Sequence, residues 1–138
     1  MKVLGLDLGS RSLGIAISDQ SKMIARGLEN YRFDDMDYDQ AINRIKHHLK
    51  QEPTIEKIIL GYPKNMNGTI GTQGKLSETF KSMLEEATDI PIILWDERLT
   101  SKMASSQMIF SKKNKKKRQK TLDQEAAVLI LQSYLDQT

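Results

Sequence analysis

The chain has 138 residues, of which 38% are hydrophobic and none is cysteine, and its net charge is +3. This length suits one domain with one core, and the lack of cysteine excludes a disulfide framework and any thiolate metal site. Because no run approaches the ~20 apolar residues of a membrane span, and Asp7 interrupts the N-terminal apolar run too early for a signal peptide, we expect a single cytoplasmic domain over residues 1–138 with no membrane partner.

The first part of the chain predicts an antiparallel meander. Short apolar stretches without a helical period alternate with segments of turn composition at hairpin lengths. The expected strands are residues 2–8, 13–18 and 23–33, separated by turns at 9–12 and 19–22.

After residue 37 the pattern changes to helices that alternate with strands. Apolar residues recur at helical spacing before Pro53 and again before Pro91, and an extended apolar run follows each proline. The later strands are each reached through a helical crossover, which predicts that they run parallel to the first strand. The expected helices are 37–49, 76–87, 100–110 and 121–135, and the expected strands are 55–60 and 92–95. The fold class is therefore α/β, with a five-stranded mixed sheet of three antiparallel strands and then two parallel ones, flanked by helices.

Three acidic residues are candidates for a site at the carboxyl ends of the parallel strands. Asp7 lies within an apolar strand, where an ionised carboxylate is unfavourable unless a cation or hydrogen-bond donors satisfy it. Glu97 follows the last strand. Asp123 lies in the first turn of the last expected helix, shortly before Ala126 and Ala127, small residues that let this helix approach the sheet.

Each acid also has a plainer explanation. Asp7 could accept hydrogen bonds from the turn at 9–12, and Glu97 could form a surface ion pair with Arg98. Asp123 fits the first turn of the last helix, within a capping box that Thr121 opens.

A bound cation would explain why three acidic residues are expected at one site. Carboxylates about 4 Å apart repel each other by ~4 kcal/mol at an effective dielectric near 20, so a cluster persists only around a positive charge. With no cysteine and only two histidines, Mg²⁺ or Mn²⁺ on oxygen ligands is the expected ion. Two such ions can activate an attacking water and stabilise a leaving oxygen.

The basic residues gather in one segment just before Asp123. Seven positive charges lie within residues 112–120, so the remainder of the chain carries a net charge of −4. Such a segment is either a solvated loop or a site for nucleic-acid phosphates, and its position beside a candidate metal ligand favours the second. The residues are Lys112, Lys113, Lys115, Lys116, Lys117, Arg118 and Lys120.

Four motifs in order resemble the YqgF (RuvX) family from end to end of the chain. They are Gly5–Arg11 with Gly14–Ala16, Gly61–Pro63 leading to Asn67, Gly68 and Gly71, Asp96–Ser101, and Asp123–Ala127. The resemblance implies a ribonuclease H-like fold related to the RuvC Holliday junction resolvases. It also implies a metal-dependent nuclease whose catalytic and metal-binding acids are Asp7, Glu97 and Asp123.

The family resemblance implies one of two substrates, the 5′ end of pre-16S ribosomal RNA, which we expect first, or a Holliday junction. Relatives such as RuvC carry an acid near the end of the fourth strand, where this chain has Gly61-Tyr62-Pro63. Glu97, after the fifth strand, would replace that acid.

Other residues of these motifs are candidate contacts to nucleic acid. Arg11 in the first turn, Asn67 in the glycine-containing loop and Arg98 beside Glu97 could each meet a phosphate. Tyr62 and Trp95 could stack on unpaired bases, although packing is the commoner role of aromatic residues at strand ends.

Two other functional classes remain open from the sequence. One is an ATP-binding domain like those of actin and the sugar kinases, although those proteins close two such domains around the nucleotide. The other is a nucleic-acid-binding accessory factor without activity. The choice between RNA and branched DNA, and between monomer and homodimer, is equally open.

Overall fold

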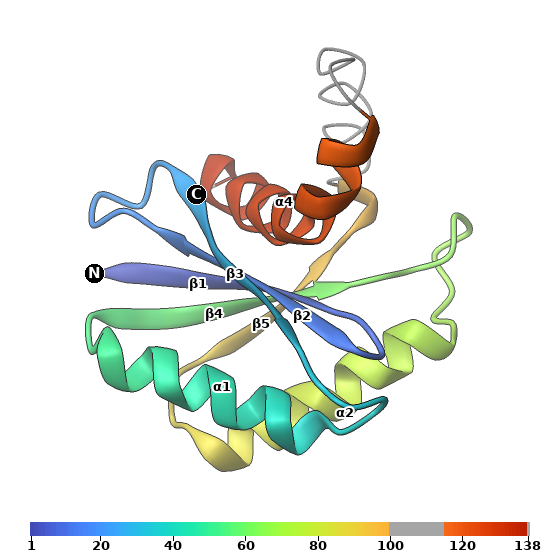
Figure 1. Ribbon diagram of the computed structural model, residues 1–138, viewed down its shortest axis with the longest axis horizontal. Helices are drawn as coiled ribbons and strands as arrows, with labels where there is room; N and C mark the ends of the chain where they lie inside the picture. The colour runs from blue at the N-terminus through green and yellow to red at the C-terminus, as the bar shows by residue number, and fades with distance from the viewer. Residues whose placement is uncertain (100–114, 138) are drawn as a thin grey trace.

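The computed structural model describes residues 1–99 and 115–137, and between 115 and 125 it describes the backbone but not the side chains. Within these ranges a five-stranded sheet lies between helices on both of its faces (Figure 1). The predicted helix at 100–110, and with it Lys112 and Lys113, lies outside the described residues. In the part that is described, no helix is both long and apolar enough to cross a membrane.

The sheet has the strand order β3-β2-β1-β4-β5. β2 is antiparallel to both β1 and β3, whereas β4 runs parallel to β1 and β5 runs parallel to β4. The predicted mixed sheet is therefore confirmed. The strands are β1 (Lys2–Leu8), β2 (Ser12–Ser18), β3 (Ala25–Arg32), β4 (Ile55–Tyr62) and β5 (Ile92–Asp96).

Strand β1 is apolar on both faces because both faces are covered. Its leucines at positions 4, 6 and 8 join the core under α1 (Tyr38–Gln51) and α2 (Thr72–Ala87). Val3, on the other face, joins a second core under α4 (Lys115–Asp136). Figure 1 shows this division, with α1 and α2 on one side of the sheet and α4 on the other.

The helices α1 and α2 form where apolar residues recur at helical spacing. Ala41, Ile42 and Ile45 of α1 and Phe80 and Leu84 of α2 are buried against the sheet. Each helix ends a few residues before a proline, which cannot donate the next backbone hydrogen bond. Both helices were predicted from this pattern, and both are confirmed.

Helix α4 lies very close to β1 at Gly5. An ideal Cβ placed on Gly5 would be 2.6 Å from the Cβ of Leu131 and 3.2 Å from the carbonyl oxygen of Ala127. Such distances leave no room for any side chain on the strand at this point. The contact fixes how closely α4 approaches β1, and it does so only two residues from Asp7 in the same strand.

The start of the last helix differs from the sequence prediction. We expected it at Thr121, but α4 begins at Lys115. Lysine, arginine and glutamine have good helix propensity, so the basic residues continue the helix instead of forming a loop before it. Asp123 is therefore not in the first turn of α4, and the predicted capping box does not begin this helix.

The close contact at Gly5 generates a prediction about stability. Gly5→Ala inserts a methyl group against the backbone of α4, and overpacking of this kind typically destabilises by about 1–3 kcal/mol. We expect the free energy of unfolding from urea denaturation to fall by that amount. Gly27→Ala is the control, because Gly27 is exposed on the edge strand β3 and the change should alter stability little. Equal effects of the two substitutions would contradict a tight contact between β1 and α4.

Candidate active site

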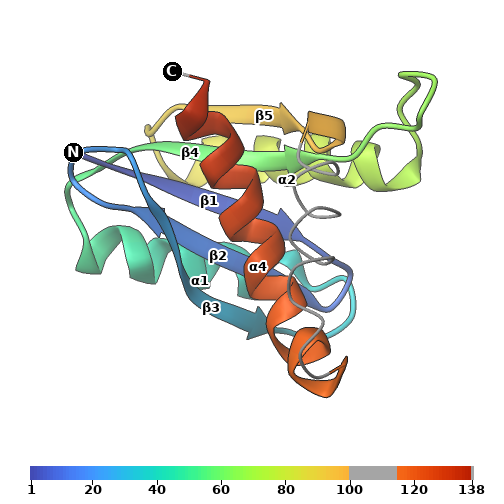
Figure 2. The same ribbon diagram turned by 90° about the horizontal axis from the view of Figure 1, so that it is seen from above.

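The carboxyl ends of the parallel strands β1, β4 and β5 point to the same end of the sheet (Figure 2). Asp7 lies at this end, in β1. It is the next-to-last residue of β1 and pairs with Gly14 of β2. Its neighbours Leu6 and Leu8 face the core under α1 and α2, so the side chain of Asp7 points to the α4 face. There it is half-buried.

Glu97 reaches the same place from the end of β5. Its backbone N–H donates a hydrogen bond of 3.1 Å to the carbonyl oxygen of Tyr62, which continues the pairing of β4 with β5 by one residue. Its side chain lies over Gly61, because an ideal Cβ on Gly61 would be 2.6 Å from Oε1 of Glu97. The carboxyl group thus sits above β4, although the residue belongs to the chain beyond β5.

The carboxyl groups of Asp7 and Glu97 interact directly. Burial, the negative charge of Asp7, a hydrogen bond between the two side chains and the charge of Asp96 together raise the pKa of Glu97 to about 8. In the metal-free protein at neutral pH, Glu97 is therefore mainly protonated and shares its proton with Asp7. The predicted approach of these two acids is observed.

This pair has the chemistry of an incomplete cation site. Two carboxylates that face each other without a cation must retain a proton, and a divalent ion on their oxygens would allow both to ionise. Hard oxygen ligands of this type suit Mg²⁺ or Mn²⁺. Among the side chains that the structure describes, no group of three Asp, Glu or His residues is arranged to hold a metal.

The third predicted acid, Asp123, belongs to α4 but its side chain is outside the described residues. On a helix, positions 123, 127 and 131 lie along one face. Ala127 and Leu131 lie directly over Gly5, so position 123 is on the sheet-facing side of α4, one helical turn before Ala127.

Arg98 is held by Asp96 and not by Glu97. Its Nε donates to Oδ1 and Oδ2 of Asp96 at 3.1 and 3.0 Å, and its Nη2 donates to Oδ2 at 2.7 Å. This ion pair lowers the pKa of Asp96. The alternative in which Glu97 forms a surface pair with Arg98 is therefore wrong for this structure, because Asp96 occupies the guanidinium and Glu97 turns toward Asp7.

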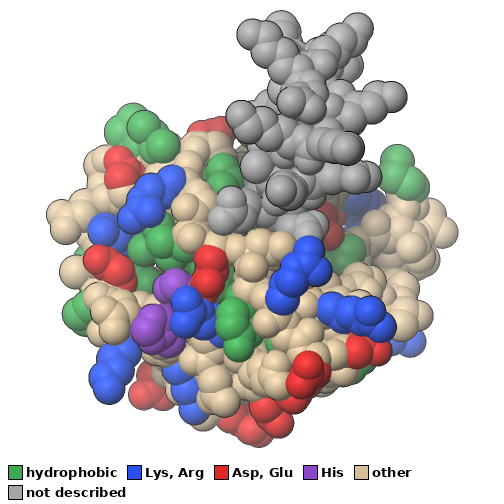
Figure 3. Space-filling view, in the orientation of Figure 1, with side chains coloured by type: hydrophobic (Ala, Val, Ile, Leu, Met, Phe, Trp, Pro, Cys, Tyr) green, Lys and Arg blue, Asp and Glu red, His purple; other side chains and the backbone are tan. Residues whose placement is uncertain are grey.

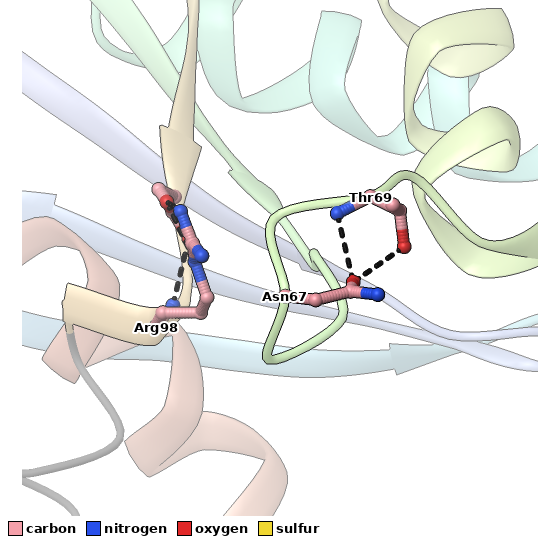
Figure 4. A network of polar contacts seen from close by, with 4 residues as sticks. Asn67, Thr69 and Arg98 are labelled. Atoms are coloured by element: carbon pink, nitrogen blue, oxygen red, sulfur yellow. Dashed lines mark hydrogen bonds and ion pairs between the residues drawn. The ribbon is translucent and has the colours of Figure 1, made fainter.

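The loop between β4 and α2 faces Arg98 across a short gap (Figure 4). Asn67 organises the loop by accepting hydrogen bonds from the backbone N–H and the hydroxyl of Thr69, at 3.1 and 2.7 Å. Gly68 has a φ of +86°, so glycine is needed there for the turn. Nη1 of Arg98 lies 3.6 Å from the position of an ideal Cβ on Gly68. The described residues thus bring two predicted nucleic-acid contacts, Asn67 and Arg98, to one side of the acids.

Other predicted contacts have structural partners. Arg11 is largely exposed on the turn after β1, and its Nε lies 3.6 Å from Oδ1 of Asp35. Trp95 donates a hydrogen bond of 3.1 Å to Ser133 of α4 and packs edge-on against Tyr134. Trp95 therefore has a packing role, as the commoner alternative predicted.

Gln73 was not identified from the sequence. Its Nε2 donates a 3.3 Å hydrogen bond to the carbonyl oxygen of Leu8, and so ties the first turn of α2 to the end of β1 beside Asp7. A polar residue at a helix start usually faces solvent, so no sequence pattern indicated this contact. Only knowledge of how α2 packs against β1 would have revealed this contact.

The described surface offers no strong basic patch on the face drawn in Figure 3, where positive and negative side chains are mixed. The seven basic residues between 112 and 120 include five in α4, but their side chains are not described. Their predicted role in holding phosphate is therefore untested by the geometry.

The fold is ribonuclease H-like. The structure is similar to that of T. thermophilus RuvC in complex with a Holliday junction substrate, with a TM-score of 0.66, 11% identity, and coverage of 96% of this chain and 91% of that one. It is also similar to the fowlpox virus Holliday junction resolvase, with a TM-score of 0.59, 14% identity and full coverage of both chains.

The sequence identifies the family within this class. Residues 1–137 match the family described as "RuvX: Holliday junction resolvase". A protein of Bacillus subtilis strain 168 named "Putative pre-16S rRNA nuclease" is 45% identical over 136 residues, which cover 99% of this chain and 98% of that protein. The chain belongs to the RuvX family, as its motifs predicted.

The shared proton of the two acids predicts how stability depends on pH without metal. Glu97 titrates near its ordinary value of 4.5 when unfolded and near 8 when folded, so between these values the folded state binds more protons than the unfolded state. The stability that protonated Glu97 contributes is fully present below about pH 4.5 and is lost as the pH rises through about 8. We expect the urea midpoint in EDTA to fall over this range, and Glu97→Gln to remove most of the fall. A wild-type midpoint that stays level over this range would be inconsistent with the assigned pair.

Proposed function

We propose that this chain, with residues 1–138 acting as one domain, is a cytoplasmic, metal-dependent nuclease that hydrolyses phosphodiester bonds. The observation that carries the proposal is the contact between Asp7 and Glu97 at the carboxyl edge of the sheet. Two half-buried acids in contact are unfavourable for stability, and a cation-binding role explains why the fold holds them together. Family membership and the full-length relatives support the same activity.

Asp7, Glu97 and Asp123 would hold the metal, Mg²⁺ or Mn²⁺. A bound divalent ion supplies an activated water and neutralises charge on the leaving oxygen. Asp7 is fixed by the pairing of β1, and Glu97 is fixed by the backbone bond to Tyr62, so the chain positions these ligands before substrate arrives. Asp123 would complete the set from the sheet-facing side of α4.

Arg98, Asn67 and Arg11 are the proposed contacts to the nucleic-acid backbone near the acids. Arg98 is held by Asp96 through Nε and Nη2, and its Nη1 faces the loop that contains Gly68. A phosphate placed between Arg98 and this loop would lie beside Glu97. The basic residues from Lys112 to Lys120 precede Asp123 in the chain. They would bind phosphates of the nucleic acid that lie farther from the cleaved bond.

The substrate that we favour is the 5′ end of pre-16S rRNA. The support is the name of relatives such as the B. subtilis protein, which this chain matches over almost its whole length. A Holliday junction is the second candidate, favoured by the description of the family. Trimming one RNA end needs only a monomer, whereas symmetric cleavage of a four-way junction suits a homodimer.

The acids generate the first activity prediction. Asp7→Asn, Glu97→Gln and Asp123→Asn should each lower the rate of metal-dependent cleavage by at least ~100-fold, more than the loss typical of an outer-shell partner of a metal. Asp89→Asn is the matched control, because Asp89 is exposed and precedes the amino end of β5, at the end of the strand away from Glu97. The assay uses a labelled pre-16S rRNA fragment and, in parallel, a four-way DNA junction, with Mg²⁺ or Mn²⁺.

The assay separates the candidate functions. Cleavage of the RNA alone supports the favoured substrate, and cleavage of the junction alone supports a resolvase. If the protein binds either nucleic acid but cuts neither with any metal, the chain is an accessory binding protein and the nuclease proposal is wrong.

The basic segment generates a prediction about salt dependence. Replacing Lys115, Lys116 and Lys117 by glutamine should weaken binding to single-stranded nucleic acid and reduce the slope of log K against log salt by about 2, or ~0.7 for each lost phosphate contact. The control replaces Lys46, Lys50 and Lys81 of α1 and α2 by glutamine, which removes the same charge from the face opposite α4. Equal slopes in the two triple variants would show that the basic segment makes no specific contribution.

A further inference from the structure

Gly61 lies beside Asp7 in the sheet. Leu60 of β4 pairs with Leu6 of β1, so the next residues along these parallel strands are Gly61 and Asp7. On its other side, Gly61 pairs with Trp95 of β5. It therefore occupies the middle strand between the two elements that carry the interacting acids.

The space above Gly61 is filled by the carboxyl group of Glu97. An ideal Cβ on Gly61 would be 2.6 Å from Oε1 and 3.2 Å from Cδ of Glu97. It would also be 2.7 Å from Cδ1 of Ile130, a residue of α4 that is only 2% exposed. The carboxyl group thus sits in a socket formed by the bare backbone of β4 below and by α4 above.

Conformation does not explain the glycine at this position. Among the described glycines only Gly68 has a positive φ, so the backbone at Gly61 could accept a residue with a side chain. What excludes a side chain is the space that Glu97 requires. Glu97 reaches this space from beyond the edge strand, and without the socket its carboxyl group could not lie over β4 next to Asp7.

We propose that Gly61 is a positioning residue, whose missing side chain forms the socket that holds the carboxyl group of Glu97 against Asp7. It follows that a carboxylate carried by residue 61 can take over the position of the Glu97 carboxylate, because a side chain there enters the same space. This second statement rests on the proposed metal-binding function of the acids.

A double-mutant cycle in EDTA tests the socket without metal or substrate. Gly61→Ala should lower the urea midpoint in the wild-type background, because the new methyl group displaces the Glu97 carboxyl group. In the Glu97→Ala background the same substitution should lower the midpoint clearly less, since the space is then empty on that side. Equal shifts in the two backgrounds would overturn the socket, because the methyl group would then be meeting Ile130 alone.

Binding of Mn²⁺, followed by the loss of the free-ion electron paramagnetic resonance signal, tests the exchange of carboxylates. We expect Glu97→Ala to weaken binding by at least ~10-fold, and Gly61→Asp in that background to restore it to within a few-fold of wild type. Gly61→Asn in the same background is the isosteric control without charge and should restore nothing. Cleavage is measured on the same four proteins, and circular dichroism melts confirm that each is folded.

The outcomes separate this inference from the proposed function. Restored Mn²⁺ binding in Gly61→Asp/Glu97→Ala supports the inference even if no protein of the series cuts nucleic acid, a result that would defeat only the nuclease activity. Binding no better than that of Gly61→Asn/Glu97→Ala, with both proteins folded, overturns the exchange. If the wild type binds no Mn²⁺, the exchange is likewise overturned, and the double-mutant cycle alone decides whether the socket exists.

Discussion

The contact between the carboxyl groups of Asp7 and Glu97 constrains much of the fold around it. Two acids placed together under a helix oppose folding through both desolvation and mutual repulsion, and the raised pKa of Glu97 records that cost. The surrounding packing must be strong enough to offset it. Gly5 and Gly61 show how closely that packing is arranged, because at both positions any side chain would collide with α4 or with Glu97 itself.

Helix α4 links the site to the stability of the whole domain. It alone covers one face of the sheet in the described chain, where it buries Ala127, Ile130 and Leu131. The same helix contains position 123 and begins within the basic segment. The proposed ligands Asp7 and Asp123 belong to opposite ends of the chain, and they would meet only after the last helix has packed on the first strand. A substitution that loosens this packing would alter the site without touching an acid.

Local sequence patterns predicted much of the fold but only part of the candidate site. Alternating apolar runs and prolines located the five strands and helices α1 and α2, because those signals depend on nearby residues. The start of α4 was misplaced, since Thr121 offers a capping signal while the lysines before it favour continued helix. Asp7 was identified because a charge in an apolar strand needs a partner. The role of Gly61 was not identified, because a glycine before Tyr62-Pro63 resembles an ordinary turn former. Its neighbours in space are set by the pairing of β4 with β1 and β5, which the local sequence does not reveal.

The position of Trp95 gives the protein an internal optical reporter. It is the only tryptophan of the chain, and it stands two residues before Glu97 with its indole N–H on Ser133 and its ring against Tyr134. Both partners belong to α4, so indole emission senses whether that helix is seated on the sheet. Docking of the last helix and unfolding can thus be followed by fluorescence in the unlabelled protein, without any change to its sequence.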